Sequence, residues 1–139
     1  MTNRIIKLLC FLIVVHCITA AAQTEPKLVT LNMPTYPALA RQARVKGVVK
    51  LTFVLPGNSG EPATVEAVSG HPLLNGAAIE SVKSWRFENH YAVERKYETT
   101  FRYQLSEVEV PLPGSPTITF KSFHQVDLVS DLAQPTVNY

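Results

Sequence analysis

The stretch that decides the fold begins with Ser69-Gly70-His71-Pro72-Leu73-Leu74 and ends with Trp85-Arg86-Phe87. Gly70 and Pro72 are residue types that mark a bend in the chain. An apolar face with helical spacing follows the bend and consists of Leu74, Ala78, Val82 and Trp85. The stretch therefore predicts a bend and then a helix between Pro72 and Phe87. The helix begins either at Pro72, which suits a first position, or after a cap at Asn75.

Strands are predicted on both sides of this helix. Before it, Gly47 opens a stretch with the period of a half-buried strand, in which the apolar positions are Val49, Leu51, Phe53 and Leu55. Residues 56–60 have the composition of a turn, and residues 64–69 return as the second strand of a hairpin. After the helix, residues 97–105 alternate between apolar or aromatic and polar side chains, which predicts the clearest strand of the chain.

A further helix is predicted at residues 36–44, where Pro37 suits the first position and Leu39, Ala40 and Ala43 form an apolar stripe. The order helix, strand, strand, helix, strand is enough for one domain. We expect an α+β fold in which a small three-stranded antiparallel sheet carries both helices on one face. The core predicted for it contains Phe53, Leu74, Val82, Trp85 and Phe101.

Residues 1–22 have the pattern of an export signal peptide. Basic residues precede an apolar run at residues 8–15, and Ala20-Ala21-Ala22 supplies small residues for cleavage before Gln23. The alternative is an uncleaved inner-membrane anchor formed by residues 5–22. Cleavage would remove both cysteines, so that the mature chain could form no disulfide. It would also leave a formally neutral chain, because 13 Lys and Arg, less the two in the signal, equal the 11 Asp and Glu.

The segments outside the predicted domain have different compositions. Residues 23–32 are a short polar lead without periodicity, which predicts a flexible segment. Residues 106–116 contain three prolines and are a predicted linker. Thr117 to Val129 has strand character, so residues 106–139 are expected to form a linker and a strand-like tail. That tail has three interpretations: a strand that widens the sheet, a competitor for the sheet edge, or the arm of a swapped dimer.

The sequence offers no set of residues typical of catalysis or of cofactor binding. His71, His90 and His124 are isolated in sequence, so no pair has the spacing of a zinc site. Gly57-Asn58-Ser59-Gly60 has the composition of a turn and lacks the Gly-x-Ser-x-Gly pattern of a nucleophile elbow. No basic block indicates nucleic acid. We therefore expect a protein that is not an enzyme, with no cofactor, no metal and no nucleic-acid partner.

Together, these motifs resemble the C-terminal domain of TonB, the periplasmic module that links an inner-membrane motor to outer-membrane transporters. The resemblance covers residues 33–105 and rests on Tyr36-Pro37, Gly47, the bend at residues 69–74 and Trp85-Arg86-Phe87. It implies a periplasmic protein of TonB-dependent transport that binds an extended transporter segment, the TonB box, and takes part in energy transduction.

In this family the last strand of the sheet receives that segment, which implies a site at residues 97–105. A strand at a sheet edge has unpaired N–H and C=O groups to which an extended peptide can add. The expected partner-binding residues are Tyr97, Glu98, Thr99, Thr100, Phe101, Arg102, Tyr103, Gln104 and Leu105. Tyr36 is a further candidate, which either packs on the sheet or lines a peptide groove.

The chain departs from a full transducer in several respects. Only residues 23–32 separate the predicted signal from the domain, and at about 3.6 Å per residue they are too short to cross a periplasm. Asn89 stands where a proline often follows the Trp-Arg-Phe motif. Any inner-membrane motor would therefore act through another protein. The alternative function is a structural or self-association domain that uses the same sheet edge to form a homodimer.

Overall fold

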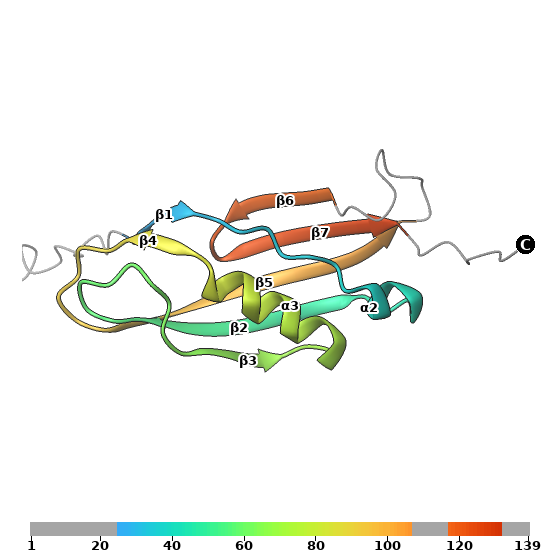
Figure 1. Ribbon diagram of the computed structural model, residues 1–139, viewed down its shortest axis with the longest axis horizontal. Coiled ribbons are helices and arrows are strands. Elements are labelled where there is room, and N and C mark those ends of the chain that lie inside the picture. Colours follow the sequence, from blue (N-terminus) through green and yellow to red (C-terminus); the bar gives the residue numbers. More distant parts are fainter. Residues whose placement is uncertain (1–24, 107–116, 132–139) are drawn as a thin grey trace, which may run out of the picture.

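The computed structural model describes residues 25–106 and 117–131, which form an α+β fold (Figure 1). Its main sheet has five strands in the order β3-β2-β5-β7-β6. Their bounds are Gly47–Leu55 for β2, Val65–Ser69 for β3, Arg95–Ser106 for β5, Thr117–Ser122 for β6 and Gln125–Asp131 for β7. The prediction of a three-stranded sheet is therefore wrong in the number of strands, because two strands of the tail extend it.

The strands predicted from alternation are present. The β2 and β3 strands form an antiparallel hairpin in which Phe53 lies opposite Val65. The β5 strand pairs antiparallel with the whole of β2, from Gly47 opposite Tyr103 to Leu55 opposite Arg95. Val49, Leu51, Phe53 and Leu55 of β2 face the helices and are buried, because alternate side chains of a strand lie on the same face.

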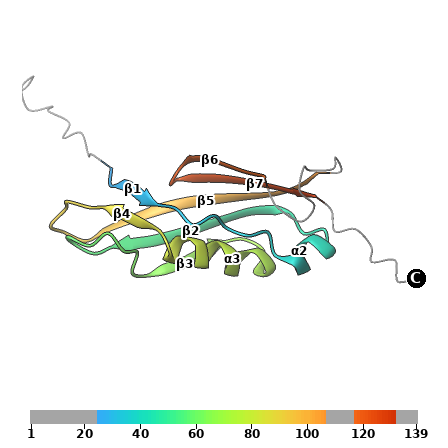
Figure 2. The ribbon, with the colours of Figure 1, turned by 45° about the horizontal axis from the view of Figure 1, so that its top comes forward.

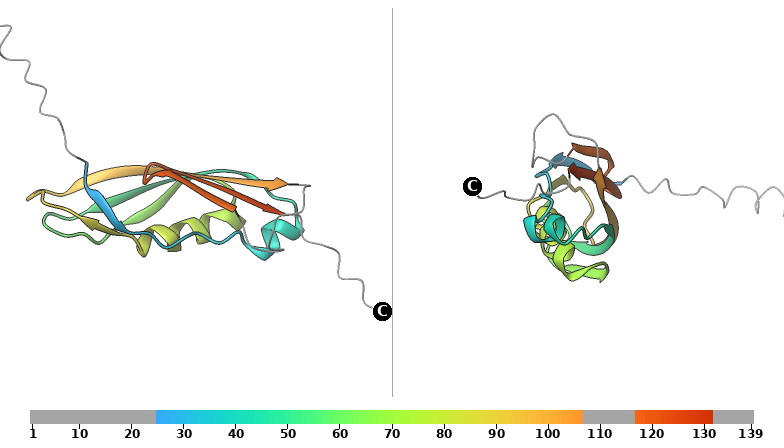
Figure 3. Two further views of the ribbon diagram at one scale, coloured as in Figure 1. Left: turned by 90° about the horizontal axis from the view of Figure 1, so that it is seen from above. Right: turned by 90° about the vertical axis from the view of Figure 1, so that its right-hand side faces the viewer.

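Both helices lie on one face of the sheet, as predicted (Figures 2 and 3). The first, α2, covers only Ala38–Gln42 and is shorter than expected. The second, α3, covers Pro72–Lys83 and begins at Pro72, so the alternative cap at Asn75 is wrong. The ring of His71 caps α3 instead, because its Nδ1 accepts a hydrogen bond from the Leu73 N–H at 3.2 Å.

The core lies between the helices and the sheet, as predicted. None of the five predicted core side chains has any exposed surface. Trp85 follows the end of α3 rather than lying on it, and its ring contacts Phe53 and Phe101 with centroid separations of 6.2 and 5.9 Å. The edge-to-face arrangement on Phe53 is a favourable geometry for aromatic pairs.

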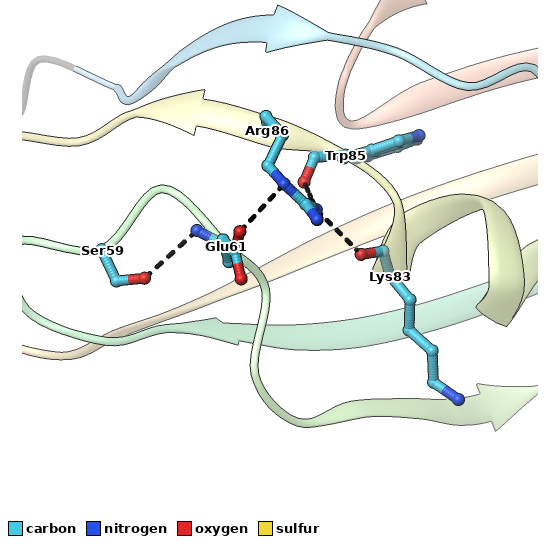
Figure 4. A network of polar contacts seen from close by, with 5 residues as sticks. All are labelled: Ser59, Glu61, Lys83, Trp85 and Arg86. Atoms are coloured by element: carbon cyan, nitrogen blue, oxygen red, sulfur yellow. Dashed lines mark hydrogen bonds and ion pairs between the residues drawn. The ribbon is translucent and has the colours of Figure 1, made fainter.

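The Trp-Arg-Phe motif joins α3 to the β2–β3 loop. Arg86 donates hydrogen bonds to the backbone oxygens of Lys83 and Trp85, and its Nε lies 3.2 Å from a carboxylate oxygen of Glu61 (Figure 4). A cation at the end of a helix stabilises the carbonyls that have no partner within the helix. The middle residue of the motif thus fixes the exit of α3, while the aromatic residues on either side of it are buried.

A second, two-stranded sheet was not predicted. It pairs β1 (Lys27–Thr30) antiparallel with β4 (Arg86–Glu88), and Leu28 lies opposite Phe87. The prediction of a flexible lead at residues 23–32 is wrong for β1. Both strands are very short, and a four-residue or three-residue strand has too few positions to show a period of two.

The tail forms a hairpin in which β6 and β7 pair antiparallel, with Ser122 opposite Gln125. The predicted signal peptide and most of the predicted linker lie outside the described residues. Within residues 25–106 and 117–131, no helix has the length and apolar character needed to cross a membrane.

Candidate peptide-binding edge

The β5 strand is an internal strand of the sheet. The β2 strand occupies one side, and the tail strand β7 pairs with its other side in parallel, from Thr100 opposite Gln125 to Ser106 opposite Asp131. The Thr100 N–H also donates to the carbonyl oxygen of His124 at 2.9 Å. The expectation that this strand lies at an open edge is therefore wrong, because the tail covers it along Thr100–Ser106.

The structure places the nine predicted residues of β5 on two faces. Thr99, Phe101 and Tyr103 point toward the helices and are buried. Glu98, Arg102 and Gln104 are exposed on the opposite face, while Tyr97, Thr100 and Leu105 are half-buried. The strand thus brings all nine together, but only its outer face is open to solvent. Whether these residues bind a partner stays a prediction.

Tyr36 lies in the core, away from the solvent. Its ring meets Tyr103 edge-to-face at 5.2 Å, and its hydroxyl donates a 2.7 Å hydrogen bond to the Val45 carbonyl oxygen. Burial raises the pKa of the Tyr36 hydroxyl and also that of Tyr103. With 5% of its surface exposed, Tyr36 packs on the sheet instead of lining a groove. Its role in partner binding stays a prediction.

Phe123 anchors the tail hairpin to the domain. It lies in the turn between β6 and β7 and inserts its ring among Phe53, Phe87 and Tyr97, with centroid separations of 6.5, 5.4 and 5.9 Å. Only 6% of its surface is exposed. The neighbouring strand, β7, adds two more buried apolar side chains, Val126 and Leu128. The hairpin is thus held by apolar contacts in addition to its backbone pairing.

The next turn residue, His124, adds polar contacts at the same place. One ring nitrogen lies 2.9 Å from the Glu98 carbonyl oxygen, and the other lies 3.0 Å from a carboxylate oxygen of Glu25. Glu25 precedes β1, so this contact joins the start of the described chain to the tail hairpin. Both segments lie outside residues 33–105, the part of the chain to which the family resemblance extends.

An ionic group crosses the outer face of β5, β7 and β6. Asp127 lies at its centre, with one carboxylate oxygen 2.9 Å from the Lys121 ammonium and the other 4.0 Å from the Nε of Arg102. The hydrogen bond from Lys121 is the largest influence that holds the pKa of the Asp127 carboxyl below its ordinary value, followed by one from Gln125.

A shallow hollow of about 550 Å³ adjoins the same end of β5. Lys46, Val48, Arg102, Gln104 and Val129 are among the residues that line it, and none of the lining residues is acidic. In residues 25–106 and 117–131, no three potential metal ligands lie together.

Sequence reasoning missed the anchoring role of Phe123 and the ionic role of Asp127. The signal available was the run of alternating residues on either side of Phe123-His124, which is the pattern of a hairpin. Neither turn residue is Gly, Asn or Asp, so the composition of a two-residue turn was absent.

The comparisons with known proteins concern the central part of the chain. The family model for the C-terminal domain of the Gram-negative bacterial TonB protein matches residues 32–105, which is more than half of the chain. No protein of curated function matches. Among solved structures, the solution NMR structure of the Pseudomonas aeruginosa TonB C-terminal domain is similar, with a TM-score of 0.48 and 22% identity over 59% of this chain and 88% of that chain.

Proposed function

Because this chain belongs to the family of C-terminal domains of Gram-negative bacterial TonB proteins, we propose that it is a non-catalytic, exported periplasmic module of TonB-dependent transport. Its ligand is an extended segment of an outer-membrane transporter, the TonB box. The segment adds to the sheet as a strand alongside β5, in the place that β7 has in the described structure.

One observation carries this proposal. A strand from outside the matched region, β7, lies parallel to β5 and pairs with it over seven positions. The side of β5 that faces away from β2 is therefore able to accept an extended segment, which needs only backbone pairing and alternate apolar side chains. Phe101 and Tyr103 supply the apolar surface on the buried face of that side.

Binding at β5 requires the tail hairpin to leave. A tethered segment has a high effective concentration, of the order of millimolar for a short linker, so the hairpin competes strongly with a free peptide. The apparent affinity of a ligand falls in proportion to the fraction of molecules in which the site is open. We therefore expect the complete chain to bind transporter peptides weakly and the chain with an undocked hairpin to bind them more tightly.

A reversible lock tests where the peptide binds. Gln104 and Val129 lie opposite one another on β5 and β7, so the pair Gln104→Cys and Val129→Cys should form a disulfide that holds the hairpin in place. Cys10 and Cys17 are replaced by Ser in every sample. We expect TonB-box peptides to bind the reduced protein and not the oxidised protein, measured by calorimetry. Each single cysteine variant is the control. Equal binding by the oxidised and reduced forms would place the peptide elsewhere and overturn the proposal.

A pair of phenylalanine variants tests the competition itself. Phe123→Ala removes the anchor of the hairpin, and the loss of a buried phenylalanine costs about 3–5 kcal/mol. The apparent peptide affinity should then rise by at least about tenfold. Phe120→Ala is the matched control, because Phe120 lies on the same hairpin but is 37% exposed. It should change the affinity much less.

Self-association is the second candidate, since a hairpin that docks on β5 of its own chain could dock on β5 of another copy. Analytical ultracentrifugation of the wild type and of Phe123→Ala separates the two functions. A dimer that dissociates in Phe123→Ala and ignores peptides supports self-association through an exchanged hairpin. A monomer that binds peptides supports the transporter-binding module.

A further inference from the structure

The side chains of β7, the strand that covers β5, indicate what kind of ligand could pair with β5 in its place. Three β7 side chains, those of Val126, Leu128 and Ser130, point toward the helices and have no exposed surface. Between the first two, Asp127 points to the opposite face, where it meets Arg102. From Val126 to Ser130 the pattern is apolar, acidic, apolar, apolar and small.

Each position of this pattern has a counterpart on β5. Val126 lies opposite Phe101 and Leu128 opposite Tyr103, so the two apolar side chains cover the two buried rings. Asp127 lies opposite Arg102, which is the only basic residue of β5 within the paired stretch Thr100–Ser106. A ligand without an acidic residue at this position would leave the guanidinium without the partner it has in the structure.

The charge around this position also favours an acidic ligand. The adjoining hollow is lined by Lys46 and Arg102 and by no acidic residue. Lys121, the other partner of Asp127, lies on β6 and would leave together with the hairpin. Once the hairpin undocks, Arg102 and Lys46 remain on the surface that the ligand meets.

We infer that β7 is the chain's own stand-in for its ligand. The segment that replaces it runs parallel to β5, places apolar side chains on Phe101 and Tyr103, and carries an acidic residue between them that Arg102 recognises. This inference rests on the proposed function and specifies the class of peptide that the site accepts.

The test compares two synthetic peptides on the same protein. One has the sequence of β7, Gln-Val-Asp-Leu-Val-Ser-Asp, and the other has Lys in place of its first Asp. Both compete with the same tail, so the ratio of their affinities is independent of how strongly the hairpin docks. The full-length Phe123→Ala chain is used as the background, because its hairpin is weakened. We expect the acidic peptide to bind about fivefold more tightly, which is in the range of a partly exposed ion pair.

Charge reversal on the protein completes the test. Arg102→Glu should reverse the preference, so that the Lys peptide binds more tightly than the acidic one. Lys96→Glu is the matched control, because Lys96 lies on the outer face of the same strand but outside the stretch paired with β7. It makes the same change in net charge and should leave the preference in favour of the acidic peptide.

The other outcomes separate this inference from the proposed function. If both peptides bind and their ratio is the same in Arg102→Glu as in the Arg102 background, the acidic position is not recognised and only the inference fails. If Lys96→Glu reverses the preference as well, the effect is general charge attraction and the inference also fails. If neither these peptides nor TonB-box peptides bind any variant, both the inference and the proposed function fail.

The direction of the peptide provides an independent measurement. A spin label on the N-terminus of a parallel peptide should broaden the NMR signals around Thr100, whereas an antiparallel peptide would broaden those around Ser106. Broadening at the Ser106 end would contradict the inference, because the side-chain pattern of β7 applies only to a parallel strand.

Discussion

Trp85 gives the core its largest buried side chain, although it lies outside the helix to which its spacing assigned it. It contacts aromatic rings of β2 and β5 and of the β4 residue Phe87. Its position between α3 and β4 allows one ring to join the helix layer, the main sheet and the two-stranded sheet. Loss of this ring would therefore remove packing contacts from the helix layer, the main sheet and the two-stranded sheet.

We expect Trp85→Ala to lower the free energy of unfolding by about 3–5 kcal/mol, because it removes a large buried ring and leaves a cavity. The measurement is chemical denaturation followed by circular dichroism. Leu39→Ala is the control, since Leu39 is 65% exposed and should change the stability by less than about 0.5 kcal/mol. A melting temperature for Trp85→Ala within a few degrees of the wild type would contradict this assignment of the core.

We expect Asp127 to make the docking of the hairpin dependent on pH, because its carboxylate contacts Lys121 and Arg102. Its pKa is lower in the folded chain than the ordinary value of 3.8. The stabilisation is therefore complete above that ordinary value and is lost as the pH falls through the lower folded value. The stability falls with falling pH because the carboxyl of the unfolded chain, which has the higher pKa, takes up its proton before that of the folded chain.

The expected result is weaker protection of the β7 amides in hydrogen exchange as the pH is lowered from about 5 to 2, after correction for the intrinsic exchange rate. The same series on Asp127→Asn gives the control, and the difference between the two proteins should disappear at the acidic end. A difference that is constant across this range would show that the Asp127 carboxylate does not stabilise the docked hairpin.

At the scale of elements, the β2–β3 loop is held by one side chain from the segment after β4. Asn89 donates to the carbonyl oxygens of Pro56 and Ser59, at 3.1 and 2.8 Å, and accepts from the Tyr91 N–H at 3.1 Å. A proline at this position could make none of these side-chain contacts. The departure from the family motif is thus compensated by a local network.

Asn89→Ala should cost about 1–3 kcal/mol, because the two loop carbonyls lose their donor. It should also speed amide exchange at Asn58, whose N–H donates to Tyr91. Glu94→Ala, an exposed change in the same connection, is the control and should leave both quantities close to the wild type. Unchanged exchange in Asn89→Ala would show that the loop does not depend on this residue.

The elements that can be predicted from the sequence are those with a sustained periodicity of apolar side chains. For β2 and β5 the two faces meet different environments, so the periodicity is strong. Periodicity did not predict β1 and β4, which are too short for a pattern. The covering of β5 was raised only as one interpretation of the tail, because a parallel pairing across a linker depends on contacts far apart in sequence.

The candidate site could also be predicted only in part: the strand β5 was predicted, and the hairpin that covers it was not. The residues of β5 were identified from the family resemblance, yet the resemblance ends before the hairpin that covers them. The anchor Phe123 could not be assigned from sequence, since its partners lie on β2, β4 and β5. Burial in a turn is decided by the tertiary arrangement and leaves no local periodicity.

At the scale of the whole molecule, the tail hairpin completes the apolar core. Phe123, Val126 and Leu128 are buried against the domain. Each such side chain contributes about 1.5–3 kcal/mol relative to the exposed state, as an upper estimate. The docked hairpin is therefore expected to add to the stability of the domain.

We expect deletion of residues 107–139 to lower the melting temperature by more than about 10 °C, because several kcal/mol of apolar burial are lost. It should also increase the binding of a hydrophobic dye. Deletion of residues 132–139 alone is the control, because it retains both strands of the hairpin. Equal effects of the two deletions would contradict the stabilising role of the hairpin.

The contact between Glu25 and His124 also has a consequence for the timing of folding. These residues are 99 positions apart in sequence. At a synthesis rate of about 5–20 residues per second, Glu25 is synthesised roughly 5–20 s before His124. The partner strand of β1, β4, is synthesised sooner. The contact between Glu25, just before β1, and His124 can form only after almost the whole described chain has been made. Because the chain becomes available from its N-terminus onward, the strand that covers β5 is the last strand of the sheet to form. Until it forms, the aromatic surface around Phe53 is open to chaperones and to other chains.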